Sequence, residues 1–427
     1  RVIGNSIRNN QEQLEASGAV VIEGTKWCGK TCTARHAAAS ALFMQDRDNS
    51  ANYKQIAATK PSLLLDGATP RLIDEWAEAP VLWDAVRYAV DMRGDVGQFI
   101  LTGSAVPKDV TDDENLKEEE KRMHSGVGRI APMRMRTMSL WESKESNGKV
   151  SLASLFEGDA DVAAISDLTI EGLAYATCRG GWPASTKLKE KAALRVARNY
   201  VEEVINYDVH RVDGVDKNTT RVRKLLESYA RNISTMAANE TIMADVRATD
   251  QTISPNTFAI YLSALRRIFI VDDVPAWSPA LRSKTKIRTS PKRHFVDPSI
   301  AVALMGTNPQ GLLKDFPTFG FLFEDLCARD LRVYAQALDG EVYHYRDKNE
   351  LECDLVVALR DGRWGAVEVK LGKNEEEDAA KHLIELSENI DNQRMKSPSF
   401  LMILTAGQYA YRRADGVYVV PIGCLKD

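Results

Sequence analysis

Apolar and polar positions alternate in two ways along the first third of the chain. Short apolar runs that favour strands lie at residues 19–23, 62–66, 71–74 and 98–102, and helix-like segments lie at 31–45 and 81–93. Strands that alternate with helices are typical of a parallel sheet covered by helices. We therefore predict an α/β domain over residues 1–146.

The middle of the chain, residues 150–306, has a mostly helical pattern. Segments 192–209 and 220–237 carry apolar residues at intervals of three and four. Ser254 before Pro255 predicts a helix N-cap with proline at the first helical position. This unit is therefore predicted to be a helical domain.

A β-like run at 268–274 and a basic segment follow that helix. The basic segment contains no acid, and its cations are Arg282, Lys284, Lys286, Arg288, Lys292 and Arg293. A capped helix followed by a basic β-arm predicts a winged helix-turn-helix, through which residues 254–293 would contact DNA. A helical spacer with a solvated loop fits the same pattern.

The last unit, residues 317–427, begins with a helix-like stretch at 319–328. Strand-like runs then alternate with Asp-Gly turns at 339–340, 361–362 and 415–416. This order predicts a small α/β domain.

Length and composition agree with a globular protein of two or three domains. The chain has 427 residues, several times the ~150 residues of an average domain. Hydrophobic residues make up 44% and charged residues 27%, which excludes a disordered or collagen-like chain. The net charge of −4 gives no general attraction to nucleic acid or acidic lipid, so any polyanion site must be a local patch.

The sequence carries no sign of export or membrane insertion. No apolar run approaches the ~20 residues of a membrane-spanning helix, so no membrane span is expected. Residues 1–5 do not resemble a signal peptide, and because they lack an initial Met we expect the true start to be missing. The six cysteines include no pair of CxxC units for zinc, which favours reduced thiols and a cytoplasmic location.

Residues 24–31 match the phosphate-binding loop pattern G-x-x-x-x-G-K-[ST]. They lie between a β-like run and an Ala-rich helical segment, which is the context that the pattern requires. The glycines let backbone N–H groups face phosphates, Lys30 would contact the β- and γ-phosphates of ATP, and Thr31 would hold Mg²⁺. The candidate nucleotide-binding residues are Gly24, Thr25, Lys26, Trp27, Cys28, Gly29, Lys30, Thr31 and Cys32.

Further strand ends supply the groups that ATP hydrolysis needs. An apolar run ends in Asp74 and is followed by Glu75, as in a Walker B motif. Asp74 would reach Mg²⁺ through water, and Glu75 would polarise the attacking water. Thr102 or Ser104 would sense the γ-phosphate, unless this strand simply ends in a turn. Arg129 follows a flexible Gly/Ser segment and would reach a phosphate in its own or a neighbouring subunit, or be structural.

The last unit carries a second acidic set, spaced as D-x13-E-x-K. Asp354 lies on one predicted strand, and Glu368 and Lys370 share one face of the next. A hairpin with a short turn would bring these three together, and Glu324 on the preceding helix would complete the set. The carboxylates would bind Mg²⁺ or Mn²⁺, and the lysine would stabilise a hydroxide or the developing phosphate charge. A hairpin with ordinary salt bridges is the alternative.

Together these motifs resemble the prokaryotic AAA-family ATPases fused to domain of unknown function 4143. The resemblance spans nearly the whole chain and rests on segments 22–31, 72–76, 100–105, 124–129, 180–183 and 416–423. It implies an ATPase core, a winged-helix segment and a restriction-endonuclease-like C-terminal domain. The carboxylate spacing also resembles the PD-(D/E)xK nuclease core, although Cys353 stands where that core often has proline.

The sequence therefore predicts an ATP-hydrolysing, Mg²⁺-dependent protein that couples its nucleotide state to DNA through the later units. Two alternatives stay open. One is a metal-dependent DNA nuclease gated by nucleotide, and the other is an ATP-bound switch for DNA or protein without turnover. ATP and ADP are the expected small-molecule partners, no membrane partner is expected, and an oligomer is compatible with the sequence.

Overall fold

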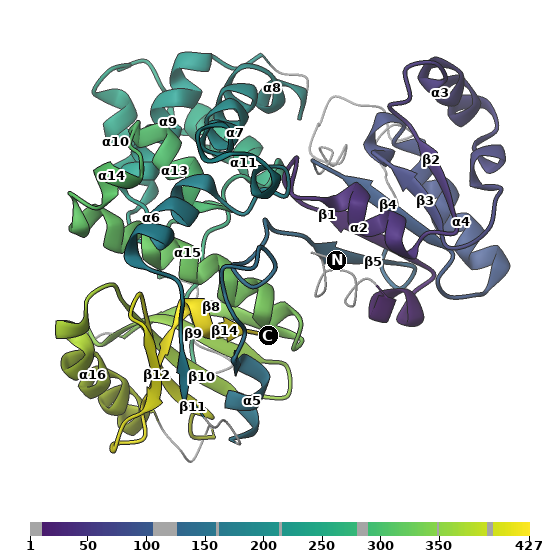
Figure 1. Cartoon of the computed structure of the whole chain (residues 1–427). Coiled ribbons are helices and arrows are strands. Elements are labelled where there is room, and N and C mark those ends of the chain that lie inside the picture. The colour runs from purple at the N-terminus through teal and green to yellow at the C-terminus, as the bar shows by residue number, and fades with distance from the viewer. Residues whose placement is uncertain are drawn as a thin grey trace.

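In the computed structural model, the chain forms an N-terminal α/β unit, a helical unit and a C-terminal sheet (Figure 1). The structure describes residues 11–105, 126–158, 162–212, 216–279, 289–347, 350–390 and 396–427. Arg282, Lys284, Lys286 and Arg288 of the predicted basic arm lie outside the described residues, as do positions 124 and 125. Within the described part, no helix is both long and apolar enough to cross a membrane.

Five parallel strands form the sheet of the N-terminal unit. They are β1 (Ala19–Glu23), β2 (Ser40–Phe43), β3 (Arg71–Asp74), β4 (Phe99–Gly103) and β5 (Ile130–Arg134). The order is β2-β3-β4-β1-β5, so β4 lies between β1 and β3. Parallel strands all end at the same edge of a sheet, so the residues that follow β1, β3 and β4 come together there.

Helices surround this sheet and close a core on each of its faces. They are α2 (Lys30–Ala37), α3 (Ser50–Thr59) and α4 (Val81–Arg93). Val21 and Ile73 lie in one core, while Val20 and Leu72 lie in the other, because successive side chains of a strand face opposite ways. The mixed α/β class and the parallel sheet are confirmed.

Two predicted elements of this unit differ from the structure. The helix expected at 31–45 is cut short, because the N–H of Ala39 bonds to the carbonyl of Pro70 at 2.8 Å and leads the chain into β2. The run at 62–66 is not a strand but a 3₁₀ helix, Pro61–Leu65. Proline at the first position has its φ already set for a helical turn.

Helices dominate the middle of the chain. They are α6 (Ile170–Arg179), α7 (Glu190–Glu203), α8 (Val209–Arg211), α9 (Thr219–Arg231), α10 (Asn239–Arg247), α11 (Pro255–Arg267), α13 (Pro298–Met305) and α14 (Pro309–Leu312). A π-helical turn, Val204–Asp208, continues α7 into α8. The predicted cap of α11 is confirmed, since Ser254 Oγ accepts the N–H of Thr257 at 3.1 Å.

A narrow hairpin follows α11, and it corrects one prediction. Val274 and Lys292 pair through an isolated antiparallel bridge. The sequence predicts that Lys292 and Arg293 belong to a basic β-arm that contacts DNA, but their side chains are only 7% and 3% exposed. Arg293 is buried beside Asp273, 3.2 Å away, and Lys292 extends into the C-terminal unit. Cations are buried in this way only when carboxylates pair with them.

The C-terminal unit is a seven-stranded sheet with a helix on each face. In spatial order the strands are β7 (Ala164–Ile165), β12 (Tyr409–Arg412), β13 (Tyr418–Pro421), β11 (Phe400–Thr405), β10 (Trp364–Lys370), β9 (Glu352–Leu359) and β8 (Gly340–Arg346). The long helix α15 (Phe316–Gln336) packs on the face that carries Leu355, and α16 (Glu376–Asn389) packs on the face of Val356.

The second and third predicted units are physically continuous. One hydrophobic core runs from Leu140 to Leu425 and includes side chains of both. In addition, β6 (Val150–Ser151) pairs with β14 (Leu425–Lys426), so the chain joins the C-terminal unit before it builds the helical one. The short helix α5 (Leu152–Glu157) follows β6 and lies beside the same unit (Figure 1).

Candidate nucleotide site and C-terminal carboxylate cluster

The loop between β1 and α2 can adopt its shape only with glycine at both ends. A Cβ at Gly24 would lie 2.1 Å from the carbonyl oxygen of Met135, which is the residue after β5. Gly29 has φ of 109° and caps α2, a conformation that residues with a side chain rarely adopt. The loop therefore wraps tightly in front of the first turn of α2, where backbone N–H groups have no intrahelical partner.

Lys30 lies inside this loop. Its side chain is buried, and its Nζ donates hydrogen bonds to the carbonyls of Gly24 and Thr25, both at 2.9 Å. The ammonium group is thus held at the centre of the loop, where it would meet a phosphate. Thr31 is partly exposed on the first turn of α2, and Cys32 is exposed behind it.

Thr102 links Asp74, the last residue of β3, to Glu75, which follows it, at the same sheet edge. Its hydroxyl donates to Asp74 Oδ1 at 2.7 Å and accepts the backbone N–H of Glu75 at 3.0 Å. The Glu75 carboxylate in turn accepts the hydroxyl of Ser104 at 3.3 Å. Burial raises the pKa of Glu75, while the charge of Lys30 partly offsets this shift. The structure therefore brings together the loop, the two acids and the hydroxyl that the sequence singles out.

Arg129 does not join this group within the chain. It lies just before β5, at the edge where the strands start, and β5 extends over five residues, ~16 Å at ~3.3 Å each. Its guanidinium pairs with Asp91 of α4 at 2.7 Å. The arginine at the loop edge is instead Arg134, the last residue of β5, which is paired in register with Glu23.

The helical unit covers the outer side of the loop. The hydroxyl of Tyr200 on α7 hydrogen-bonds to Thr25, and Asp208 in the π-helical turn forms an ion pair with Lys26. The ring of Trp27 lies 5.7 Å from that of Tyr200. Three consecutive residues of the loop therefore contact a different unit of the chain.

The segment 180–183 packs against both Tyr200 and the loop. Trp182 is fully buried with its ring 4.5 Å from Tyr200, and a Cβ at Gly29 would lie 3.4 Å from Pro183. Sequence reasoning missed Tyr200 and Asp208, because neither belongs to a local motif. The only signal was the Gly-Gly-Trp-Pro string, whose role depends on tertiary structure.

In the C-terminal unit, the structure brings Glu324, Asp354, Glu368 and Lys370 together. Lys370 Nζ lies 2.7 Å from Glu368 Oε2 and 3.3 Å from Asp354 Oδ2. Burial and the charge of Asp354 raise the pKa of Glu368 to about 8, and burial raises that of Glu324 to about 7. Although burial opposes it, Lys292 and Lys370 lower the pKa of Asp354.

Lys292 is the residue that the sequence analysis did not place at this cluster. Its Nζ lies 2.7 Å from Glu324 Oε1 and 3.1 Å from Asp354 Oδ1. Among the described residues, no group of three or more His, Cys, Asp or Glu side chains is arranged to hold a metal ion. The cluster is therefore an ion-paired network of three acids and two lysines.

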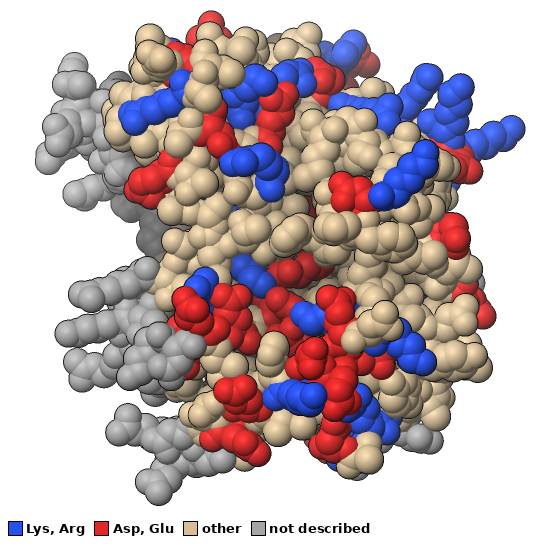
Figure 2. Space-filling view, turned by 90° about the vertical axis from the view of Figure 1, so that its left-hand side faces the viewer, with Lys and Arg blue, Asp and Glu red and all other residues tan. Residues whose placement is uncertain are grey.

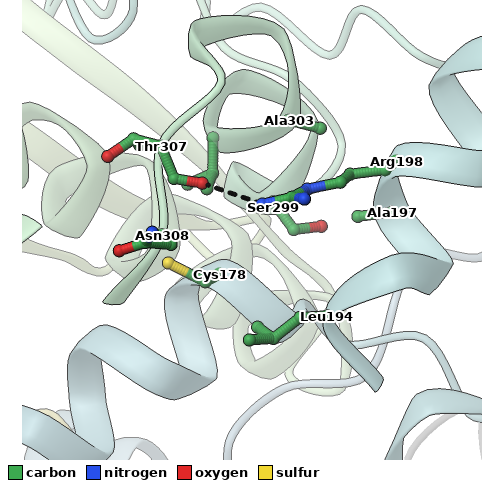
Figure 3. A pocket seen from close by; sticks show the side chains of 9 residues that line it. Cys178, Leu194, Ala197, Arg198, Ser299, Ala303, Thr307 and Asn308 are labelled. Carbon is green, nitrogen blue, oxygen red and sulfur yellow. Dashed lines mark hydrogen bonds between the residues drawn. The ribbon is translucent and has the colours of Figure 1, made fainter. Parts of the chain in front are cut away.

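A separate pocket lies within the helical unit, between α6, α7 and α13 (Figure 3). Cys178, Leu194 and Ser299 are among its lining side chains, and Arg198 crosses it to bond the carbonyl of Thr307 at 3.4 Å. Its volume of about 10 Å³ has room for about one water molecule, so it is no site for a nucleotide.

Family models match three successive parts of the chain. Residues 16–143 match a model described as AAA domain, residues 170–311 match "Domain of unknown function (DUF8612)", and residues 319–425 match "Domain of unknown function (DUF4143)". The chain thus carries an AAA domain. Together with the P-loop fold of its sheet, this match supports an ATP-binding, ATPase-type function, joined to a DUF4143 region.

Among solved structures, the chain is similar to the Walker-type ATPase PABY2304 of Pyrococcus abyssi. The identity is 12%, the TM-score is 0.42, and the match covers 71% of this chain and 95% of that one. A likeness this weak carries no argument about fold or function. Comparison with curated proteins gives no match.

Proposed function

We propose that this protein is a Mg²⁺-dependent ATPase whose nucleotide state is passed from its AAA domain to the helical unit. The observation that carries the proposal is the hydroxyl of Thr102, which fixes Asp74 and Glu75 beside a phosphate-binding loop. This hydroxyl bonds the carboxylate of Asp74 and the backbone N–H of Glu75, so it orients one acid and fixes the backbone of the next, an arrangement that would position both for catalysis.

The residues present suit ATP with Mg²⁺. Thr31 and Asp74 offer hydroxyl and carboxylate oxygens, the ligands that Mg²⁺ prefers, and Asp74 Oδ2 is not used by Thr102. Bound Mg²⁺ would neutralise charge on the phosphate oxygens. Lys30 would leave the carbonyls of Gly24 and Thr25 for the phosphates, and Glu75 would hold the attacking water and accept its proton.

The contacts outside the loop suggest how the nucleotide state would reach the rest of the chain. Tyr200 and Asp208 hold the loop residues Thr25 and Lys26, which lie directly beside the candidate phosphate position. A phosphate that attracts Lys26 competes with Asp208 for the same ammonium group. Nucleotide binding would therefore loosen the π-helical turn that joins α7 to α8.

DNA is the proposed partner of the later units. The support is in the sequence, where residues 282–288 contain four cations and no acid. Such a segment neutralises phosphates, so binding to duplex DNA would weaken steeply as salt is raised. Salt-independent affinity, or none at 50 mM salt, would contradict this part of the proposal.

The ATPase proposal is tested by phosphate release. Lys30→Ala is expected to lower turnover by at least about a hundredfold. Glu75→Gln should lower turnover similarly but retain ATP binding, because it removes the base and not the loop. Lys54→Ala, which removes a surface lysine paired with Glu78, is the matched control and should hydrolyse ATP normally. Equal rates for Lys30→Ala and wild type would refute the proposal, and tight binding without any phosphate release would favour a non-hydrolysing switch.

A further inference from the structure

Both oxygens of Asp354 are already bonded within the protein. Oδ1 accepts from Lys292 Nζ at 3.1 Å. Oδ2 accepts the backbone N–H of Val369 at 3.0 Å and lies 3.3 Å from Lys370 Nζ. A divalent cation at the cluster would need these same oxygens as ligands. The arrangement therefore does not fit the metal that the nuclease-like spacing implies.

The cation in this position comes from another part of the fold. Lys292 belongs to the hairpin of the helical unit, whereas Asp354 and Glu368 lie on β9 and β10 of the C-terminal sheet. Its backbone is fixed, because Lys292 and Val274 exchange two hydrogen bonds of 3.0 Å each. The ammonium group therefore comes from a buried side chain whose backbone is held by the Val274–Lys292 bridge.

The cleft in front of the cluster is also unsuited to nucleic acid without added cations. It has a volume of about 500 Å³, and the charged side chains among its described lining residues are mostly acidic: Asp347, Glu350, Glu352, Asp354, Glu368 and Glu385, beside Lys370 and the titratable His382. Figure 2 shows many acidic side chains over the C-terminal unit, with several Lys and Arg side chains among them. A phosphate backbone would be repelled by the acidic lining of this cleft, which lies apart from the basic segment 282–288 in the sequence.

The geometry points to Lys292 as a built-in cation that replaces a divalent metal at the Asp354–Glu368 cluster. As long as Lys292 contacts Glu324 and Asp354, its ammonium group links the helical unit to the C-terminal unit and occupies the carboxylate oxygens that a metal ion would need. A lysine provides positive charge but no open coordination position for water. The cluster therefore serves as an ion-paired contact between the two units, and the C-terminal unit does not act as a nuclease. This inference is independent of ATP hydrolysis.

Manganese binding to the full-length, nucleotide-free protein tests the inference. Isothermal titration with MnCl₂ compares the wild type with Lys292→Met and with the double variant Lys292→Met/Glu324→Gln. The double variant removes one positive and one negative charge, so it keeps the net charge of the cluster and remains useful if the single variant does not fold. Lys224→Met, on the surface of α9, is the matched control.

The wild type and Lys224→Met are expected to bind no Mn²⁺ at this cluster. Both Lys292 variants should bind one ion, with an affinity at least about tenfold above the weakest that the titration detects, because a cation within ~4–6 Å changes the affinity of a carboxylate for positive charge by 1–3 powers of ten. Adding Asp354→Asn should abolish that binding. The inference is overturned if the wild type binds an ion that Asp354→Asn removes, or if the folded double variant binds no more Mn²⁺ than the wild type.

Discussion

Removing the hydroxyl of Thr102 tests whether this residue positions Asp74 and Glu75 at the end of β3. Thr102→Val keeps the β-branched shape of the side chain at a fully buried position, so the change removes the hydroxyl and leaves the shape of β4 nearly unaltered. The variant deletes a donor that lies 2.7 Å from Asp74 Oδ1 and an acceptor 3.0 Å from the N–H of Glu75. One charged partner is lost and one backbone donor is left unbonded.

The size of the effect follows from these two bonds. A hydrogen bond to a charged group contributes about 1.5–3 kcal/mol, and an unbonded buried N–H costs about 1–3 kcal/mol. If the transition state for hydrolysis loses about 2 kcal/mol of this stabilisation, kcat/KM decreases roughly thirtyfold. Most of the loss should be in kcat, because Thr102 does not touch the phosphate-binding loop.

The assay is steady-state phosphate release, with Thr102→Ser as the matched control because it keeps the hydroxyl. Thermal unfolding of both variants shows whether the fold is intact. The reasoning is refuted if Thr102→Val hydrolyses ATP at the wild-type rate. It is also refuted if Thr102→Ser is as slow as Thr102→Val while both unfold at the wild-type temperature.

Two other predictions concern stability. In a double-mutant cycle of Lys26→Met and Asp208→Asn, thermal unfolding should give a coupling energy of about 1 kcal/mol, because Lys26 is one-third exposed and its ion pair is partly screened. A coupling below about 0.3 kcal/mol would show that this pair does not hold the loop. Glu142 is buried against Ser139, and burial raises its pKa to about 7. The folded state therefore holds a proton that the unfolded state releases near pH 4.5, so stability should fall by about 3 kcal/mol between pH 4.5 and 7 and then level off. Glu142→Gln should lose this slope in urea titrations across that range, and an unchanged slope would assign it to another group.

Local sequence signals predicted the parts of the structure that depend on local geometry. The loop at 24–31, the cap at Ser254 and the helix at 81–93 each follow from glycine, capping or periodicity rules that act within a few residues. The strands β9 and β10 also appear where alternation and an Asp-Gly turn predict them. In these segments the tertiary structure agrees with the local preference.

Contacts between distant segments could not be predicted in this way. Tyr200 is 175 positions from Thr25, and Lys292 is 62 positions from Asp354. The basic segment from Arg282 to Arg293 was predicted to contact DNA or to form a solvated loop. Nothing in the sequence indicates that its Lys292 is buried among acids. For Arg129 the sequence left a phosphate contact and a structural role open, because the Gly/Ser segment before it does not show at which edge of the sheet β5 begins; within the chain its partner is Asp91.

The pairing of β6 with β14 constrains the order in which parts of this protein can fold during synthesis. Val150 lies beside Leu425 in register, so a strand made early has no partner until residue 425 has been synthesised, 275 positions later. The helical unit is synthesised in between and must form while the early strand has no partner. Such a distant closure is slow to form. Truncation before residue 425 would therefore destabilise the helical unit as well as the C-terminal unit. The AAA domain precedes β6 in the sequence and is expected to fold without this strand pair.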